Sequence, residues 1–116
     1  MTSKEMEARS GVARANIRYY EAEGLLTPAR RKNGYRDYSE ADLALLEKIK
    51  LLRRLGVSVE ELKALRSGST SLAAVLDRRL AELQGERASQ ERVETVCGAL
   101  RRSGETFSTL NAARYL

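Results

Sequence analysis

Apolar residues recur at the spacing of a helix in five separate segments of the chain, so we expect five helices. The expected helices cover about residues 3–10, 13–23, 39–55, 58–67 and 71–101. Gly11, Gly24 and Gly56 come directly after the first three segments, and glycine is a common residue just past the end of a helix. The pattern therefore predicts a mainly α protein.

Three of these segments begin at a serine or threonine that is followed three residues later by an acidic residue. Such a pair can form a capping box, in which the hydroxyl accepts from the later amide and the acidic side chain reaches back. Two pairs fit this form and the third is a looser version: Thr2–Glu5, Ser58–Glu61 and Ser39–Asp42. Ala13 precedes the second helix without a capping side chain, which costs about 1 kcal/mol.

The first two helices are joined by a tight turn at Gly11 and Val12, which is the form of a helix-turn-helix. A plain pair of packed helices has the same pattern, so this signal alone leaves both interpretations open. Ile17 and Tyr20 lie three residues apart and form the apolar side of the second helix. The opposite side carries the residues that would enter a DNA groove, which are Arg14, Ala15, Arg18 and Tyr19.

Residues 27–38 have no helical pattern. They hold the only proline of the chain and the Asn33-Gly34 pair, which is typical of a hairpin turn. A small basic hairpin after a helix-turn-helix is a wing that can reach the DNA backbone, whereas a solvated loop is the alternative. The tyrosines Tyr35 and Tyr38 beside the turn favour the wing. Its cationic residues are Arg30, Arg31, Lys32 and Arg36.

The long final segment carries a stripe of residues at coiled-coil spacing. A single helix cannot bury such a stripe, so we expect a second copy of the chain to cover it in a homodimer; folding back onto the preceding helices is the alternative. The expected dimerisation residues are Leu76, Leu80, Leu83, Gln90, Val93, Cys97 and Leu100. We therefore divide the chain into residues 1–67, 71–101 and a short tail over 102–116.

Composition narrows the chemistry. The 116 residues include no histidine and a single cysteine, Cys97, so we expect no catalytic triad, no histidine metal site, no intrachain disulfide and no cofactor. No apolar run approaches the length of a membrane span, and the first residues do not form a signal peptide. We expect a cytoplasmic protein. The net charge is +5, most of it before residue 67, which favours an anionic partner and nucleic acid before membrane.

One ordered set of motifs joins these elements. It runs through Gly11-Val12, Ile17-Arg18-Tyr19-Tyr20-Glu21, Gly24-Leu25-Leu26, Pro28, Gly34-Tyr35-Arg36, Tyr38, Leu55-Gly56-Val57-Ser58 and Glu60-Glu61. In order and spacing this set resembles the MerR family of bacterial transcription regulators over about residues 2–66. The long helix that follows agrees with the dimerisation helix of that family.

The resemblance implies a winged helix-turn-helix DNA-binding domain with a small β-hairpin wing, followed by an antiparallel coiled coil between two protomers. Such dimers bind an inverted repeat in a promoter and bend and untwist its spacer, so that they act on RNA polymerase indirectly through DNA shape. The resemblance places Arg18 and Tyr19 on DNA. Together with the pattern, it assigns Arg36 and Tyr38 to phosphates from the wing, and Arg53 to a second wing near Leu55-Gly56.

The chain departs from the metal sensors of that family, because no cysteine or histidine follows Leu100. We expect Cys97 to be a small apolar seam residue, and the effector is unidentified. The alternatives are an excisionase-like or architectural DNA-binding protein and a coiled-coil adaptor for another protein. An enzyme is the least favoured class, because no nucleophile–base pair and no metal site can be assembled.

Overall fold

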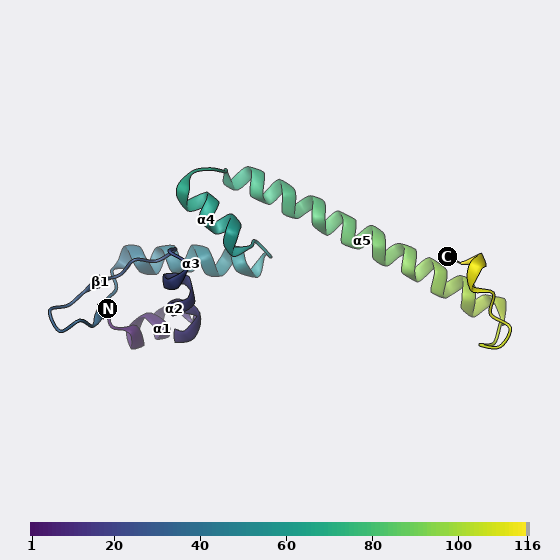
Figure 1. Ribbon diagram of the computed structural model, residues 1–116, viewed down its shortest axis with the longest axis horizontal. Coiled ribbons are helices and arrows are strands. Elements are labelled where there is room, and N and C mark those ends of the chain that lie inside the picture. Colours follow the sequence, from purple (N-terminus) through teal and green to yellow (C-terminus); the bar gives the residue numbers. More distant parts are fainter. Residues whose placement is uncertain (116) are drawn as a thin grey trace. The chain divides into compact units, whose positions relative to one another are not determined.

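A computed structural model describes residues 1–115 and divides the chain into two compact units, Met1–Leu76 and a second that begins at Asp77 (Figure 1). The elements follow the order α1 (Ser3–Ser10), α2 (Arg14–Ala22), β1 (Ala29–Arg30), β2 (Arg36–Asp37), α3 (Glu40–Arg54), α4 (Val59–Ser67), α5 (Leu72–Ser103) and a 3-10 helix, η1 (Ala112–Arg114). The mainly α fold, the hairpin and the five helices are confirmed, with helix ends within two residues of those expected.

The helix starts follow the capping pattern. At Ser39 and Ser58 the capping box is complete, because the carboxylates of Asp42 and Glu61 accept hydrogen bonds from the backbone amides of these two serines. At Thr2 only half of it forms. The Glu5 amide donates to the Thr2 hydroxyl at 3.1 Å, and this hydroxyl then donates to the Glu5 carboxylate at 3.2 Å. Ala13 caps α2 with no side-chain bond, as expected.

The core of the first unit holds the helix pair and the hairpin together. Its most buried side chains, from α1, α2, α3 and the loops, are Met6, Ile17, Leu25, Leu46 and Val57. Val75, at the start of α5, belongs to the same core at 3% exposure. The compact unit therefore extends into the first turn of α5 and ends at Leu76.

The hairpin pairs Ala29 with Asp37 and Arg30 with Arg36 in antiparallel register. Its turn has a three-residue loop rather than a two-residue Asn-Gly turn. The Gly34 amide donates to the Arg31 carbonyl at 2.9 Å, and the Arg31 amide donates to Tyr35 at 2.8 Å. Gly34 has a φ of 83°, the left-handed conformation that this loop requires and that glycine adopts without strain.

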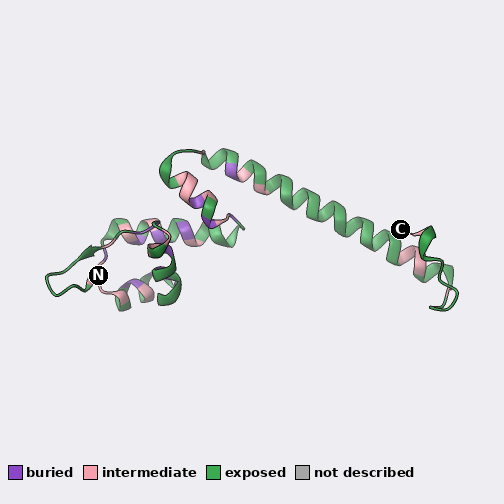
Figure 2. Cartoon of the chain, viewed as in Figure 1, coloured by how far each residue is buried: buried purple, intermediate pink, exposed green. Residues whose placement is uncertain are grey.

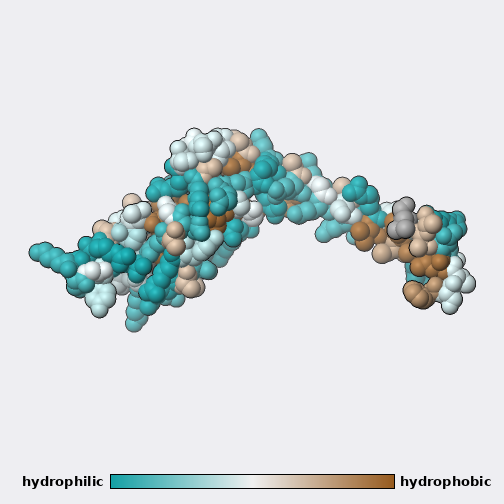
Figure 3. Space-filling view, in the orientation of Figure 1, coloured by the Kyte–Doolittle hydropathy of each residue, from teal (hydrophilic) through white to brown (hydrophobic). Residues whose placement is uncertain are grey.

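The helix α5 has 32 residues, and Val75 is its one buried residue within the part of the chain that the structure describes (Figure 2). Leu80 and Val93 on the expected seam are 57% and 60% exposed. Brown apolar side chains lie open toward the C-terminal end of α5 in Figure 3. Most of the stripe is thus uncovered within one chain, while Leu76 and Leu100 at its two ends are half-buried.

After α5 the described chain forms turns and η1, with Phe107 fully open to solvent. The last residue of the expected tail, Leu116, lies outside the described residues. No helix among the described residues has both the length and the apolar character needed to cross a membrane.

The buried row of α3 gives a direct test of this core. Leu46 is fully buried, and we expect Leu46→Ala to lower the free energy of unfolding by about 2–5 kcal/mol through the cavity it leaves. Leu51→Ala on the exposed side of the same helix is the matched control and should change it by less than about 0.5 kcal/mol. Urea denaturation followed by circular dichroism measures both. Equal losses would contradict the assigned core.

Candidate nucleic-acid interface

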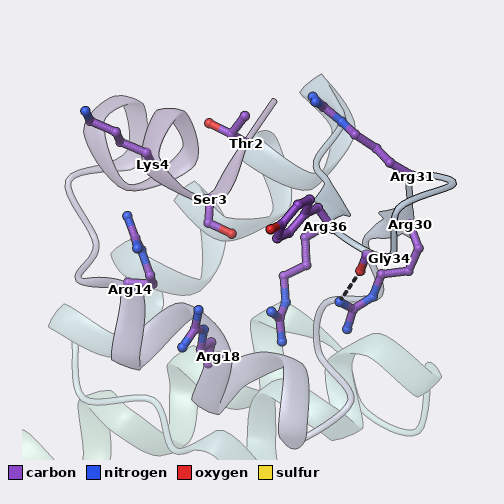
Figure 4. Close-up of a pocket in the computed structure, with 10 residues that line it drawn as sticks. Thr2, Ser3, Lys4, Arg14, Arg18, Arg30, Arg31, Gly34 and Arg36 are labelled. Atoms are coloured by element: carbon purple, nitrogen blue, oxygen red, sulfur yellow. Dashed lines mark hydrogen bonds between the residues drawn. The ribbon is translucent and has the colours of Figure 1, made fainter.

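Side chains from α1, α2 and the hairpin surround one open hollow of about 440 Å³ (Figure 4). Six of the lining residues are cationic and none is acidic. The lining residues are Thr2, Ser3, Lys4, Arg14, Arg18, Arg30, Arg31, Gly34, Tyr35 and Arg36. Cationic side chains that converge from three elements form a surface suited to a polyanion such as the DNA backbone.

The helix α2 contributes to this hollow because its two faces differ. Ile17 and Tyr20 are buried at 1% and 9% exposure and hold the helix on the core. On the outward face of the same helix, Arg14 and Arg18 face the hollow, as Figure 4 shows. Ala15 and Tyr19 are also exposed, so the outward face of α2 is the one expected from the spacing.

The cations of the hollow are only partly neutralised. Arg14 lies 3.4 Å from Glu7, and Arg31 lies 3.7 Å from Asp37. Both contacts are exposed, and pairs of this kind contribute little stability. Arg36 is paired with Glu21 at 2.8 Å. Arg18 has no hydrogen-bond or ion-pair partner within residues 1–115, and the same is true of Lys32, which lies in the hairpin loop outside the lining. Positive charge therefore remains available for an anion.

At the base of the hairpin, the carboxylate of Glu21 on α2 binds two side chains of the wing. The Arg36 Nε donates to Glu21 Oε2 at 2.8 Å, and the Tyr38 hydroxyl donates to Glu21 Oε1 at 2.5 Å. Burial raises the pKa of Tyr38, and the hydrogen bond to the Glu21 carboxylate raises it further.

Tyr38 corrects the site expected from the sequence. The expectation that it holds a phosphate does not fit its position, because the ring is in the core at 3% exposure and its hydroxyl is taken by Glu21. Residues two positions apart in an extended segment share a side, and both side chains reach the Glu21 carboxylate. The apolar Tyr38 ring packs into the core, whereas the Arg36 side chain stays at the hollow. Arg36 lines the hollow and Tyr38 anchors the hairpin beneath it.

Arg53 is not among the residues that line the hollow. Its Nη1 donates to the Val57 carbonyl at 3.0 Å and so supports the turn between α3 and α4. The side chain remains exposed, and contact with DNA at a second wing stays a prediction for it. Arg30, similarly, donates to the Gly34 carbonyl at 3.2 Å across the hairpin loop.

Sequence reasoning missed the contribution of α1. Thr2, Ser3 and Lys4, at the start of that helix, line the same hollow as the wing. The sequence pattern predicts only a capping role for Thr2. A lysine in an otherwise mixed-charge segment carries no signal of its own, and its proximity to Arg36 follows from packing rather than from spacing along the chain.

The expected seam lies on α5, outside this hollow. Leu80, Leu83 and Val93 are exposed in the single chain, and Cys97 is an exposed free thiol. No group of three histidine, cysteine, aspartate or glutamate side chains suited to a metal ion occurs within the described residues. The pairing of the seam residues with a second copy stays a prediction.

Comparison with known proteins identifies relatives of this chain. The profile of the MerR HTH family regulatory proteins matches residues 1–69. The HTH-type transcriptional regulator HmrR of Rhizobium leguminosarum bv. viciae is 34% identical over 111 residues, which cover 84% of this chain and 86% of that protein.

The solved structures with a fold similar to that of this chain include two that cover about nine-tenths of it. The transcription regulator PbrR691 of Ralstonia metallidurans CH34, in complex with lead(II), superposes with a TM-score of 0.74 at 26% identity, covering 91% of this chain and 88% of that one. EcmrR in its complex with DNA superposes with a TM-score of 0.73 at 25% identity, covering 89% of this chain and 39% of that one.

The buried hydroxyl of Tyr38 gives a prediction for alkaline pH. Because its pKa is raised in the folded state, its contribution to stability is complete below pH 10 and is lost as the pH rises through the raised value. We expect Tyr38→Phe to flatten the fall in melting temperature above about pH 10. Tyr35→Phe, at an exposed ring, is the control and should leave the fall unchanged. Identical curves for the two variants would refute the assignment.

Proposed function

The chain belongs to the MerR family of HTH regulatory proteins, and we propose that it acts as a homodimer on an inverted repeat within a promoter. As a member of this family it is a DNA-binding transcription regulator and not an enzyme. The observation that carries the proposal is the hollow in which cationic side chains of α2 and the hairpin converge.

Within each protomer, α2 enters the major groove and the hairpin follows the neighbouring phosphates. Arg18 and Tyr19, with Arg14 and Ala15, form the surface that meets the groove. The phosphate contacts come from the wing, through Arg30, Arg31, Lys32 and Arg36. Phosphate contacts position the protein, and only the few side chains at the base edges specify sequence.

The dimer forms through α5. The seam of Leu76, Leu80, Leu83, Gln90, Val93, Cys97 and Leu100 pairs with its copy in an antiparallel coiled coil. Exposed apolar residues along a long helix support this pairing, because a single chain leaves them in water. A two-fold symmetric dimer presents two identical reading surfaces, and an inverted repeat has the same symmetry.

Regulation then acts through DNA shape. The dimer bends and untwists the spacer between promoter elements, and RNA polymerase responds to the altered DNA. The energy for this deformation, of order 1–6 kcal/mol for a smooth bend, comes from the added backbone contacts. Such a mechanism requires no reaction on the protein.

The excisionase-like and adaptor alternatives are not favoured by the family assignment. A DNA-binding regulator acts where the chromosome lies, which supports the cytoplasm as its location. The single cysteine and the absence of histidine from the sequence argue against sensing of a metal ion by paired ligands within this chain.

Arg18 carries the test of this proposal. We expect Arg18→Ala to abolish specific binding to the operator while the dimer stays intact, because this cation has no partner among the described residues and faces the hollow. Arg66→Ala removes the same charge from exposed α4 and is the control. Fluorescence anisotropy measures the binding, and sedimentation velocity measures the dimer. Unchanged binding, or loss of the dimer together with binding, would overturn the assignment.

The dependence on salt tests the number of phosphate contacts. If the dimer neutralises roughly six to ten phosphates, its affinity should fall by about 10³ to 10⁵ between about 50 and 200 mM salt. A titration of labelled operator at several salt concentrations gives this slope. A flat response would remove the wing residues from the interface.

A further inference from the structure

We propose that Glu21 is a positioning residue that joins α2, the helix that enters the major groove, to the wing and presents Arg36 to a DNA phosphate. The inference rests on the proposed function, because it assumes that Arg36 meets DNA. It assigns a role in DNA binding to an acidic side chain, which by charge alone opposes a polyanion.

The position of the Glu21 carboxylate is the first argument. Its side chain is only 11% exposed, and both oxygens are used, one by Arg36 and one by the Tyr38 hydroxyl. A carboxylate with this little exposure to water is stabilised by such partners. Arg36 and Tyr38 belong to the hairpin segment and Glu21 belongs to α2, so one group fixes the distance between the two elements.

The geometry at Arg36 is the second argument. Glu21 accepts from Nε, and no hydrogen bond from Nη1 or Nη2 to another described residue is present. Figure 4 shows the side chain reaching from the hairpin toward α2 at the wall of the hollow. The outer edge of a guanidinium held in this way can bind one phosphate through two parallel N–H groups. The protein has then already fixed the side chain, so less freedom is lost when DNA binds.

The weakness of the hairpin itself is the third argument. Its strands have two residues each, and a two-stranded ribbon of this length is not stable alone. Its loop is exposed to solvent. The direction of the wing therefore depends on attachments at its base, and the Glu21 contacts connect that base directly to α2.

The experiment compares Glu21→Gln with Glu23→Gln. Both remove one negative charge from the end of α2, but Glu23 pairs with Lys63 of α4 rather than with the wing. Operator affinity is measured for each variant alone and combined with Arg36→Ala, together with the salt slope. The amide in Glu21→Gln still accepts from Tyr38, so the variant removes mainly the charge that holds Arg36.

We expect Glu23→Gln to bind the operator as well as the unmodified protein or more tightly. Glu21→Gln should bind about tenfold more weakly than Glu23→Gln, with the salt slope reduced by up to about two for the dimer, since each lost phosphate contact removes about 0.9. Arg36→Ala should then add less than about threefold in the Glu21→Gln background, because the two residues act together. A destabilised fold alone would not change the salt slope.

The outcomes separate this inference from the proposed function. If Arg36→Ala leaves affinity unchanged in the unmodified protein, the proposed wing contact fails. If Arg36→Ala weakens binding equally in both backgrounds, or if Glu21→Gln behaves like Glu23→Gln, the wing contact stands and the role of Glu21 is refuted. If Glu21→Gln does not fold, Tyr38→Phe is the second variant, because it keeps the ion pair between Glu21 and Arg36 but removes the hydroxyl that holds the other carboxylate oxygen. The effects of Tyr38→Phe and Arg36→Ala on operator affinity should then be partly coupled. Fully independent effects would also refute the role of Glu21.

Discussion

The placement of the wing beside the reading helix depends on the buried contact between Tyr38 and Glu21. The ring of Tyr38 packs in the core of the first unit, and its hydroxyl meets the carboxylate of Glu21 on α2. The hairpin that precedes Tyr38 is too short to hold a direction by itself. The Tyr38 ring is held by apolar packing, and its hydroxyl makes a directional hydrogen bond to Glu21. Together these contacts fix the position of the arginine-rich hairpin relative to α2.

Electrostatics accounts for what this surface can do. The hollow collects six cationic side chains without an acidic one among its lining. Glu21 pairs closely with Arg36, and Glu7 and Asp37 form longer, exposed contacts with Arg14 and Arg31. Like charges brought together in this way repel one another, and a polyanion relieves that repulsion by replacing many small counterions at once. The arrangement therefore favours a continuous backbone of phosphates over a single small anion.

Most of the fold could be predicted from the sequence, and part of the site could not. Helix starts at Ser39 and Ser58 and ends at glycines depend on local chemistry, which spacing reveals. The burial of Tyr38 and the role of Glu21 depend on contacts across 17 positions of the chain, which no local pattern encodes. For the same reason Lys4 was missed. The three-residue loop at Gly34 shows that a turn motif predicts a hairpin more securely than its register.

In the proposed dimer, two copies of this surface read two symmetric half-sites of DNA. Selection of bound sequences from random duplex DNA by the purified protein, at about 150 mM salt where non-specific binding is weak, tests it most directly. We expect an enriched inverted repeat whose half-sites are separated by whole turns of the double helix. Enrichment of a single half-site, of curved DNA without a repeat, or of no sequence would contradict it.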